Sequence, residues 1–234
     1  IVDHYEGATH AFVRFVGRCW RNRLLRSTAT KTDEFMVACS YARRFSFREN
    51  APKLDDLLQD GLSLVICGTA ASKASAERKA YYAGRGNKFW ATLHEVGLTD
   101  EVLRPEQYRQ LFRYGIGLTD VAKTHAGGDR EIPKHTFDPE ALVAKLREIK
   151  PRVVCFNGKE AAKRFFRIRS VKLGKYDSGH PDLPGITFFV APSTSGAACG
   201  SWDVSKWHEL VEILMALGHR HHYVAGIKGA SCGR

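Results

Sequence analysis

Two short stretches of the chain hold residues that could act on a polar ligand. The first is the glycine and small-residue run 68–72 (GTAAS), and the second is 192–196 (PSTSG), with three consecutive hydroxyl residues. Hydroxyl groups and backbone N–H groups can bind phosphate oxygens without adding charge. Neither stretch has the glycine spacing of a P-loop or of a dinucleotide site, so a small-nucleotide site is the less favoured interpretation.

The cysteines do not form a metal or redox motif. The six cysteines lie twenty or more residues apart and none forms a C-x-x-C pair. This spacing argues against zinc-finger, thioredoxin-like and iron–sulfur sites, so we expect no metal and no organic cofactor. Cys67 and Cys155 lie inside apolar runs and are expected in the core. Free thiols favour a reducing, intracellular (cytoplasmic) location.

Basic residues are in excess and are clustered. The formal net charge is +11 over 234 residues. Residues 73–88 hold five cations against one acid, and residues 159–175 hold seven against one. Basic stripes of this kind suit a polyanion, most often a nucleic acid, whereas a solvated face that only keeps the protein soluble is the alternative.

Apolar runs of two kinds must position the polar stretches. Short runs rich in branched residues predict buried strands, and amphipathic spacing predicts helices. Strands and helices alternate, which indicates an α/β fold: a three-layer α/β/α arrangement around a central four-stranded, mostly parallel sheet. The expected strands are 63–68, 116–122, 152–158 and 186–191, and the expected helices are 87–96, 105–114, 139–149, 159–166 and 202–217.

The chain is expected to hold one globular domain with extensions. We predict a helical N-terminal extension over residues 1–60, the α/β domain over 61–220 and a tail over 221–234. With 44% hydrophobic residues the chain can bury a core, but no apolar run approaches the roughly 20 residues of a membrane-spanning helix. Ligands of such sheets bind beyond the carboxyl ends of the strands, where segments starting at Gly68, Asp120, Asn157 and Pro192 lie.

The motifs at these strand ends, in this order, resemble the uracil-DNA glycosylase superfamily. The resemblance is closest to its mismatch-specific uracil/thymine and hypoxanthine branches. It implies a DNA repair enzyme that flips out uracil, hydrolyses its N-glycosidic bond in single- or double-stranded DNA and leaves an abasic site, as a monomer without a cofactor. The segments that carry it are CGTAAS (67–72), YYAGRGNKFW (81–90), VGLTDEVLRPEQ (96–107), YGIGLTDVAK (114–123), FNGKEA (156–161) and APSTSG (191–196).

Three departures from the family pattern bear on activity. Ala70 stands where the mismatch-specific branch has the Asn that positions the attacking water, and Ala191 stands where the main uracil-specific branch has a His. Residues 196–198 (GAA) lack the bulky Leu that fills the gap left by the flipped base. The missing Leu favours single-stranded or mismatched substrates, or another residue that fills the gap. The losses at positions 70 and 191 motivate the alternative of a protein that binds uracil or abasic sites with little or no turnover.

Asn87 is the candidate catalytic residue that the resemblance to the hypoxanthine branch implies. An amide can hold a water through its carbonyl oxygen while preorganised dipoles stabilise the oxocarbenium-like sugar. The alternative is that Asn87 only caps the helix that follows it, since Asn is a favoured N-cap residue.

The resemblance also implies a base pocket and a DNA-binding surface. Tyr82 would stack on the flipped base or pack against Phe89 or Trp90. Asp120 stands where relatives have the Asn that reads the base edge; it could accept from uracil N3–H, or activate water instead. Asn157 would contact the base or cap the next helix. The expected base-pocket residues are Gly68, Tyr82, Asp120 and Asn157, and the expected DNA contacts are Ser72, Lys73, Ser193, Thr194 and Ser195.

Overall fold

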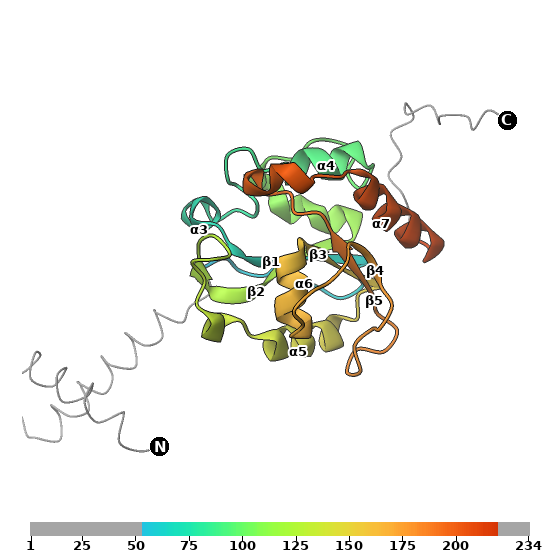
Figure 1. Ribbon diagram of the computed structural model, residues 1–234. Helices are drawn as coiled ribbons and strands as arrows, with labels where there is room; N and C mark the ends of the chain where they lie inside the picture. The colour runs from blue at the N-terminus through green and yellow to red at the C-terminus, as the bar shows by residue number, and fades with distance from the viewer. Residues whose placement is uncertain (1–52, 220–234) are drawn as a thin grey trace, which may run out of the picture. The chain divides into compact units, whose positions relative to one another are not determined.

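The apolar runs of the sequence form the strands of one sheet. The computed structural model describes residues 53–219, except for the side chains of residues 199–201. The sheet has the order β2-β1-β3-β5-β4 (Figure 1). Its strands are β1 (Leu64–Ala71), β2 (Ile116–Ala126), β3 (Val153–Asn157), β4 (Gly174–Tyr176) and β5 (Thr187–Ala191).

Four of the strands are parallel, as expected. β1 pairs in parallel with β2 and with β3, and β3 pairs in parallel with β5. The register sets Gly68 of β1 opposite Asp120 of β2, and Asn157 of β3 opposite Ala191 of β5. The carboxyl ends of these strands therefore meet at the same edge of the sheet.

The predicted number of strands was wrong by one. β4 pairs antiparallel with β5 at the edge of the sheet. It holds only Gly174, Lys175 and Tyr176, of which Lys175 is exposed. An edge strand this short does not need an apolar run, so the pattern that predicts buried strands could not detect it.

Helices cover both faces of the sheet, which confirms the three-layer α/β/α class. Helices α4 and α7 lie on one side of the sheet and α5 and α6 on the other (Figure 1). One core contains apolar side chains of α4, η1 and α7 packed on the sheet, and the other contains those of α5 and α6. Neighbouring residues of β1 alternate between them, with Ile66 in the first core and Val65 and Cys67 in the second. The helices are α3 (Lys73–Arg78), α4 (Phe89–Glu95), η1 (Pro105–Tyr114), η2 (Lys134–Thr136), α5 (Pro139–Ile149), α6 (Lys159–Phe166), η3 (Gly196–Ser201) and α7 (Ser205–Ala216).

Local signals explain why some helices were predicted to the residue. The Asp138 carboxylate accepts from Ala141 N at 2.9 Å at the start of α5, Pro139 takes the first helical position, and Lys150 ends the helix in the left-handed conformation. In contrast, α3 lies within the basic cluster 73–88, where no helix was expected before residue 87, and 105–114 is a 3₁₀ rather than an α-helix.

Residues 53–60 run beside β2. Leu57 and Leu118 exchange both backbone hydrogen bonds at 2.9 Å, and Lys53 N donates to Lys123 O at 2.8 Å. The segment thus covers an edge that would otherwise expose unpaired backbone groups. The rest of the predicted extension and the predicted tail lie outside the described residues. Within residues 53–219, no helix is both long enough and apolar enough to span a bilayer.

The two-sided core predicts contrasting effects of neighbouring substitutions on α7. Leu214 is fully buried, whereas Met215 is 52% exposed. Leu214→Ala should lower the free energy of unfolding by about 2–5 kcal/mol because it leaves a cavity, and Met215→Ala should change it by less than about 0.5 kcal/mol. Urea unfolding followed by circular dichroism measures both, and equal effects would contradict this packing.

Candidate active site

Both polar stretches lie at the carboxyl edge of the sheet, and hydrogen bonds hold the second one, 192–196, to neighbouring segments. The Asn157 amide nitrogen donates to Thr194 Oγ1 at 2.8 Å, and Thr194 N donates to Asn157 Oδ1 at 3.0 Å. Lys88 N, in the segment after the first stretch, donates to Thr194 O at 2.9 Å. The loop after β5 is therefore fastened both to β3 and to the start of α4.

Gly68 lets the side chain of Asp120 lie directly against the backbone of β1. A Cβ atom at residue 68 would lie 2.5 Å from Asp120 Oδ1 and 3.4 Å from the Tyr82 hydroxyl. Asp120 is only 5% exposed. The structure thus brings three of the four expected base-pocket residues together around one position that lacks a side chain.

Tyr82 has an unusual conformation and an unpaired hydroxyl. Its φ of 54° lies in the left-handed region, which is costly for a bulky residue. Its ring stacks on Phe89 with centroids 3.8 Å apart, and this contact uses one face of the ring. The hydroxyl is buried and makes no hydrogen bond within the described part of the chain. Burial, and secondly the charge of Asp120, raise its pKa well above the ordinary value, so the hydroxyl remains a proton donor.

The charge of Asp120 is balanced by a residue that the motifs did not identify. Burial raises the pKa of Asp120, and the Lys123 ammonium, 3.5 Å from Oδ2, opposes that rise. Lys123 lies three residues further along β2 and also contacts Asp56. A lysine directly after the buried residues 116–122 of β2 was the signal in the sequence that could have indicated this pairing.

The side chain of Asn157 has a structural role, because it holds the loop after β5. Its amide is 8% exposed and both ends of it bond to Thr194. The expectation that it caps the next helix was wrong, because Gly158, with φ of 108°, takes the cap position of α6. Thr194 is fully buried, so its hydroxyl faces Asn157 rather than solvent.

Asn87 has the capping bond that was the alternative to catalysis. Its Oδ1 accepts from Phe89 N at 3.0 Å. The residue also lines a pocket of about 590 Å³ with Tyr82 and Trp90, and arginines at positions 78, 85 and 104 contribute to the pocket wall. Arg85 is exposed and its carbonyl lies beside Gly196 of the loop after β5. Asn87 therefore lies between an open basic pocket and the strand-end loops.

The expected DNA-binding residues have different environments. Ser72 Oγ accepts from Ser75 N at 3.1 Å and begins α3, and Lys73 pairs with Glu131 at 3.2 Å while remaining exposed. Ser193 is partly exposed and Ser195 is exposed. A ligand can therefore reach Lys73, Ser193 and Ser195, whereas Thr194 is buried.

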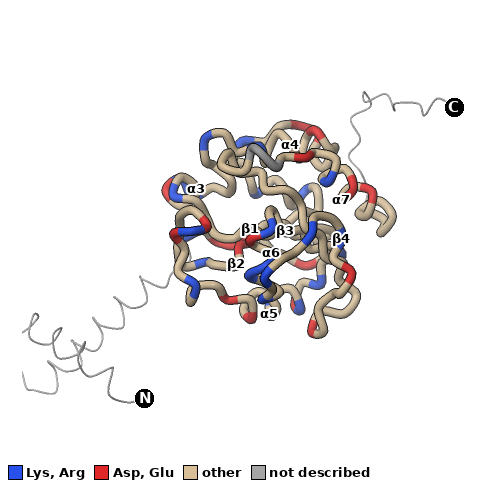
Figure 2. The backbone as a smooth tube through the Cα atoms, in the orientation of Figure 1, with Lys and Arg blue, Asp and Glu red and all other residues tan. Residues whose placement is uncertain are grey.

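Acidic residues neutralise part of the basic clusters. Arg78 pairs with Glu106, and Lys163 and Arg164 both pair with Glu160 on α6, where basic and acidic positions lie close together (Figure 2). Acidic partners from outside the two basic clusters (73–88 and 159–175) include Glu106, Glu131 and Glu140, which are all distant in sequence from the cations they pair with. The sequence count therefore overstates the positive charge that is free to meet a polyanion.

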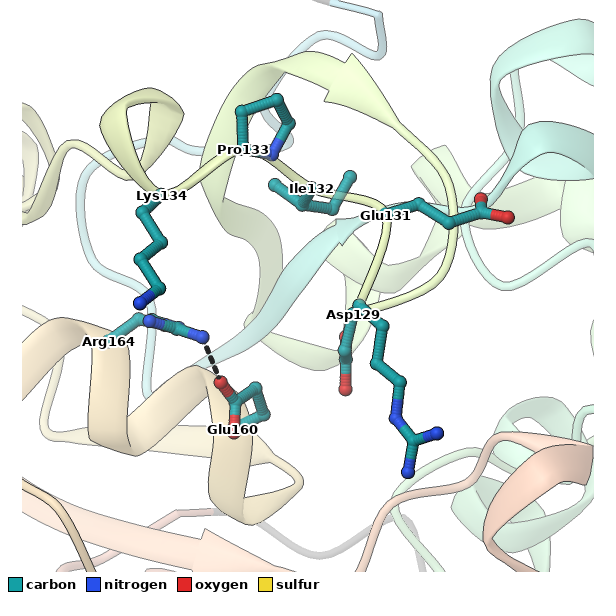
Figure 3. A pocket seen from close by; sticks show the side chains of 8 residues that line it. Asp129, Glu131, Ile132, Pro133, Lys134, Glu160 and Arg164 are labelled. Carbon is teal, nitrogen blue, oxygen red and sulfur yellow. Dashed lines mark ion pairs between the residues drawn. The ribbon is translucent and has the colours of Figure 1, made fainter.

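A second pocket, of about 580 Å³, lies between α6 and the loop after β2 (Figure 3). Asp129 points from that loop toward Glu160 and Arg164 of α6. The Asp129 carboxylate interacts with the Thr69 hydroxyl, next to Gly68. Sequence reasoning did not single out Asp129, although it lies in the segment that follows the second strand. Among the described residues, no group of three His, Cys, Asp or Glu side chains could hold a metal ion.

The contact at Gly68 predicts a strained variant. Gly68→Ala should destabilise the fold by about 1–3 kcal/mol, because the new methyl group would overlap Asp120 Oδ1. Gly128→Ala is the matched control, since nothing lies within 4 Å of a Cβ there. Thermal or urea unfolding measures both variants, and the double variant Gly68→Ala/Asp120→Ala should recover part of the loss. A Gly68→Ala protein as stable as the Gly128→Ala protein would contradict the close approach.

Comparisons with known proteins agree with this architecture. The solution NMR structure of a proposed uracil DNA glycosylase from Methanosarcina acetivorans has 23% sequence identity and a TM-score of 0.52; the match covers 71% of this chain and 98% of that one. This likeness supports the fold alone. The sequence profile of the uracil DNA glycosylase superfamily matches residues 56–214. Because that match spans the whole sheet and both strand-end motifs, the chain belongs to the uracil DNA glycosylase superfamily.

Proposed function

We propose that the protein excises uracil and other deaminated bases from DNA by hydrolysing the N-glycosidic bond, which leaves an abasic site. Membership of the superfamily supports the role of a DNA glycosylase, a hydrolase of DNA repair. The observation that carries the substrate assignment is the pair of polar groups beside Gly68: Asp120 Oδ1 and the unpaired Tyr82 hydroxyl.

These two groups complement the edge that deamination creates. Deamination of cytosine or adenine replaces an amino group with a carbonyl and leaves an N–H on the neighbouring ring nitrogen. A carboxylate accepts such an N–H, and a tyrosine hydroxyl donates to the adjacent carbonyl. A site built to satisfy both groups rejects bases that leave one of them unpaired. Tyr82 would thus supply the donor that a charged Asp120 lacks.

Asn87 is the proposed catalytic residue. Its Oδ1 bonds to Phe89 N but has a second lone pair, which could hold a water. The water oxygen would bond to the sugar C1′ as the N-glycosidic bond breaks. The base would leave with the bonding electrons and take up the proton that the water releases. Preorganised dipoles would stabilise the positive sugar. Asp120, beside Gly68, and Asp129, which interacts with Thr69, are the alternative groups that could activate the water.

DNA is the proposed partner. Arg85 and Lys88 lie in the segment that leads into α4, where Lys88 N bonds to the loop after β5. Cations at this point would contact phosphates while the exposed hydroxyls of Ser193 and Ser195 bind neighbouring oxygens. Because residues 196–198 hold no bulky wedge, single-stranded or mismatched DNA would be preferred, since extrusion of a base costs less there. We expect the protein to act as a monomer inside the cell.

A second candidate function is binding of uracil or abasic sites with little turnover. Ala70 favours it, because this position in β1 carries no group that can orient water. Multiple-turnover product formation separates the two functions: a binding protein would retard DNA on a gel without creating abasic sites.

The first activity experiment uses a labelled oligonucleotide with one uracil, single- or double-stranded, followed by alkaline cleavage. The wild type should cleave it, and Asn87→Ala should lower the rate at least about a hundredfold, roughly 2.7 kcal/mol. Asn87→Ser is the matched control, since serine caps a helix as well as asparagine but offers no amide. Equal stability of Asn87→Ser and wild type, with lost cleavage, assigns Asn87 to catalysis. Unchanged cleavage would refute that role and make Asp120→Asn and Asp129→Asn the next variants.

A second experiment tests how Tyr82 contributes. Tyr82→Phe retains the ring and its contact with Phe89 but removes the hydroxyl. If the hydroxyl reads the base carbonyl, uracil excision should fall at least about tenfold, which corresponds to roughly 1.4 kcal/mol. Tyr176→Phe, on β4 and stacked on Phe166, is the matched control. Full activity of Tyr82→Phe together with loss in Tyr82→Leu would assign Tyr82 to stacking alone.

A further inference from the structure

Four charged residues form a cluster behind the proposed base pocket. Lys123 Nζ lies 2.9 Å from Asp56 Oδ1 and 3.5 Å from Asp120 Oδ2. Lys145 Nζ lies 2.6 Å from Asp56 Oδ2. The side chains of Lys123 and Asp120 are 15% and 5% exposed. The proposed reaction uses Asp120 and gives the other three residues no role.

The cluster fixes Lys123 from several directions. Its ammonium also donates to the Tyr81 hydroxyl at 3.0 Å, and that hydroxyl donates to the Asp55 carbonyl at 3.0 Å. Asp56 in turn accepts from Thr119 Oγ1 at 2.7 Å. A long lysine side chain that is bonded in this way loses its freedom on folding, so its position relative to Asp120 is set by the surrounding residues.

The cluster is balanced: two carboxylates face two ammonium groups. Removal of Lys123 would leave two carboxylates with one cation, and buried like charges favour proton uptake by one of them. The charged groups around Asp120 are Lys123 on β2, Asp56 before β1 and Lys145 on α5. The neighbouring Tyr81 and Tyr82 hydroxyls and the Cys67 thiol stay neutral, because burial raises the pKa of each.

Each oxygen of Asp120 has a different neighbour. Oδ2 faces Lys123, while Oδ1 lies against Gly68 on the side of the Tyr82 hydroxyl. A charged carboxylate can only accept hydrogen bonds, whereas a protonated one can also donate. The charge state of Asp120 therefore decides which base edge Oδ1 can meet.

We propose that Lys123, held in place by Asp56, is a positioning residue that keeps Asp120 charged with Oδ1 turned to the base pocket, so that the pocket accepts a base through a ring N–H. This inference rests on the proposed function, in which Asp120 reads the base. A protonated Asp120 would instead suit the bare ring nitrogen and amino group of cytosine or adenine. The cluster thus separates uracil from cytosine and hypoxanthine from adenine.

The first test measures the charge of Asp120 without any substrate. Carboxyl ¹³C NMR titration of the full chain, with Asp120→Asn for assignment, gives the pKa of Asp120. Lys123→Met should raise it by at least one pH unit, Lys145→Met should raise it less, and Lys123→Arg should restore it. Lys172→Met, at an exposed position outside the cluster, is the matched control. An unchanged pKa in both methionine variants would overturn the proposal, and Lys145→Met keeps the test decisive if Lys123→Met does not fold.

The second test measures the pH profile of single-turnover excision from DNA with one uracil. Because the charged form of Asp120 is the active one, the wild-type rate should rise with pH through the pKa of Asp120 and then level off. Lys123→Met should move the rising part of the pH profile to higher pH. It should also lower the ratio of uracil to cytosine excision at least tenfold. If Lys123→Met lowers the rate equally at every pH and the rising part of the profile stays at the same pH, the proposal is overturned.

The titration and the pH profile together distinguish failure of the proposed function from failure of the inference about Lys123. If the wild type forms no abasic sites at any pH while the titration shift is present, the proposed function fails and the action of Lys123 on Asp120 stands. If the wild type is active and neither the titration nor the profile moves, the proposed function stands and the inference about Lys123 fails.

Discussion

The packing of polar side chains at the strand ends depends on residue 68 being a glycine. The parallel register sets Asp120 of β2 opposite Gly68, and only a glycine leaves room for Asp120 Oδ1 at that distance. The same space admits the Tyr82 hydroxyl, which comes from the segment between α3 and α4. Burial of the Tyr82 hydroxyl costs solvation energy that no hydrogen bond within residues 53–219 recovers.

The hydrogen bonds that polar residues already make limit the roles they can have at the site. Ala70 of β1 carries no polar group, and the polar groups beside Gly68 come from β2 and from the segment before α4. Asn157, which closes β3, uses both ends of its amide in holding the loop after β5. Asn87 is partly used in starting α4 and retains hydrogen-bonding capacity. The two asparagines thus illustrate why residue type alone does not assign a role: the number of partners already bound decides what remains for a ligand.

The sequence predicted the parallel strands and several helices because their signals are local. Asp138, Pro139 and the residues around Lys150 mark the ends of α5 independently of the rest of the fold. It did not predict β4, whose three residues carry no apolar pattern, or the burial of Thr194, which depends on an amide 37 residues away. The pairing of Asp56 with Lys123 and with Lys145, 89 residues away, is likewise a product of tertiary structure. Sequence spacing located the edge of the sheet where the site lies, but not which side chains share bonds there.

The buried charges near β2 are better understood through specificity than through stability. Two carboxylates and two ammonium groups lose much of their hydration here, and replacing such a cluster with apolar residues is often neutral or stabilising for a fold. Burial has a second effect, since low local polarity strengthens the influence of each charge on its neighbour. In water, a lysine 3.5 Å from an aspartate oxygen would change the protonation of that aspartate little. Asp120 is only 5% exposed, and here the nearby Lys123 can decide whether Asp120 is protonated. The energetic disadvantage of the cluster and its capacity to control Asp120 therefore have the same physical origin.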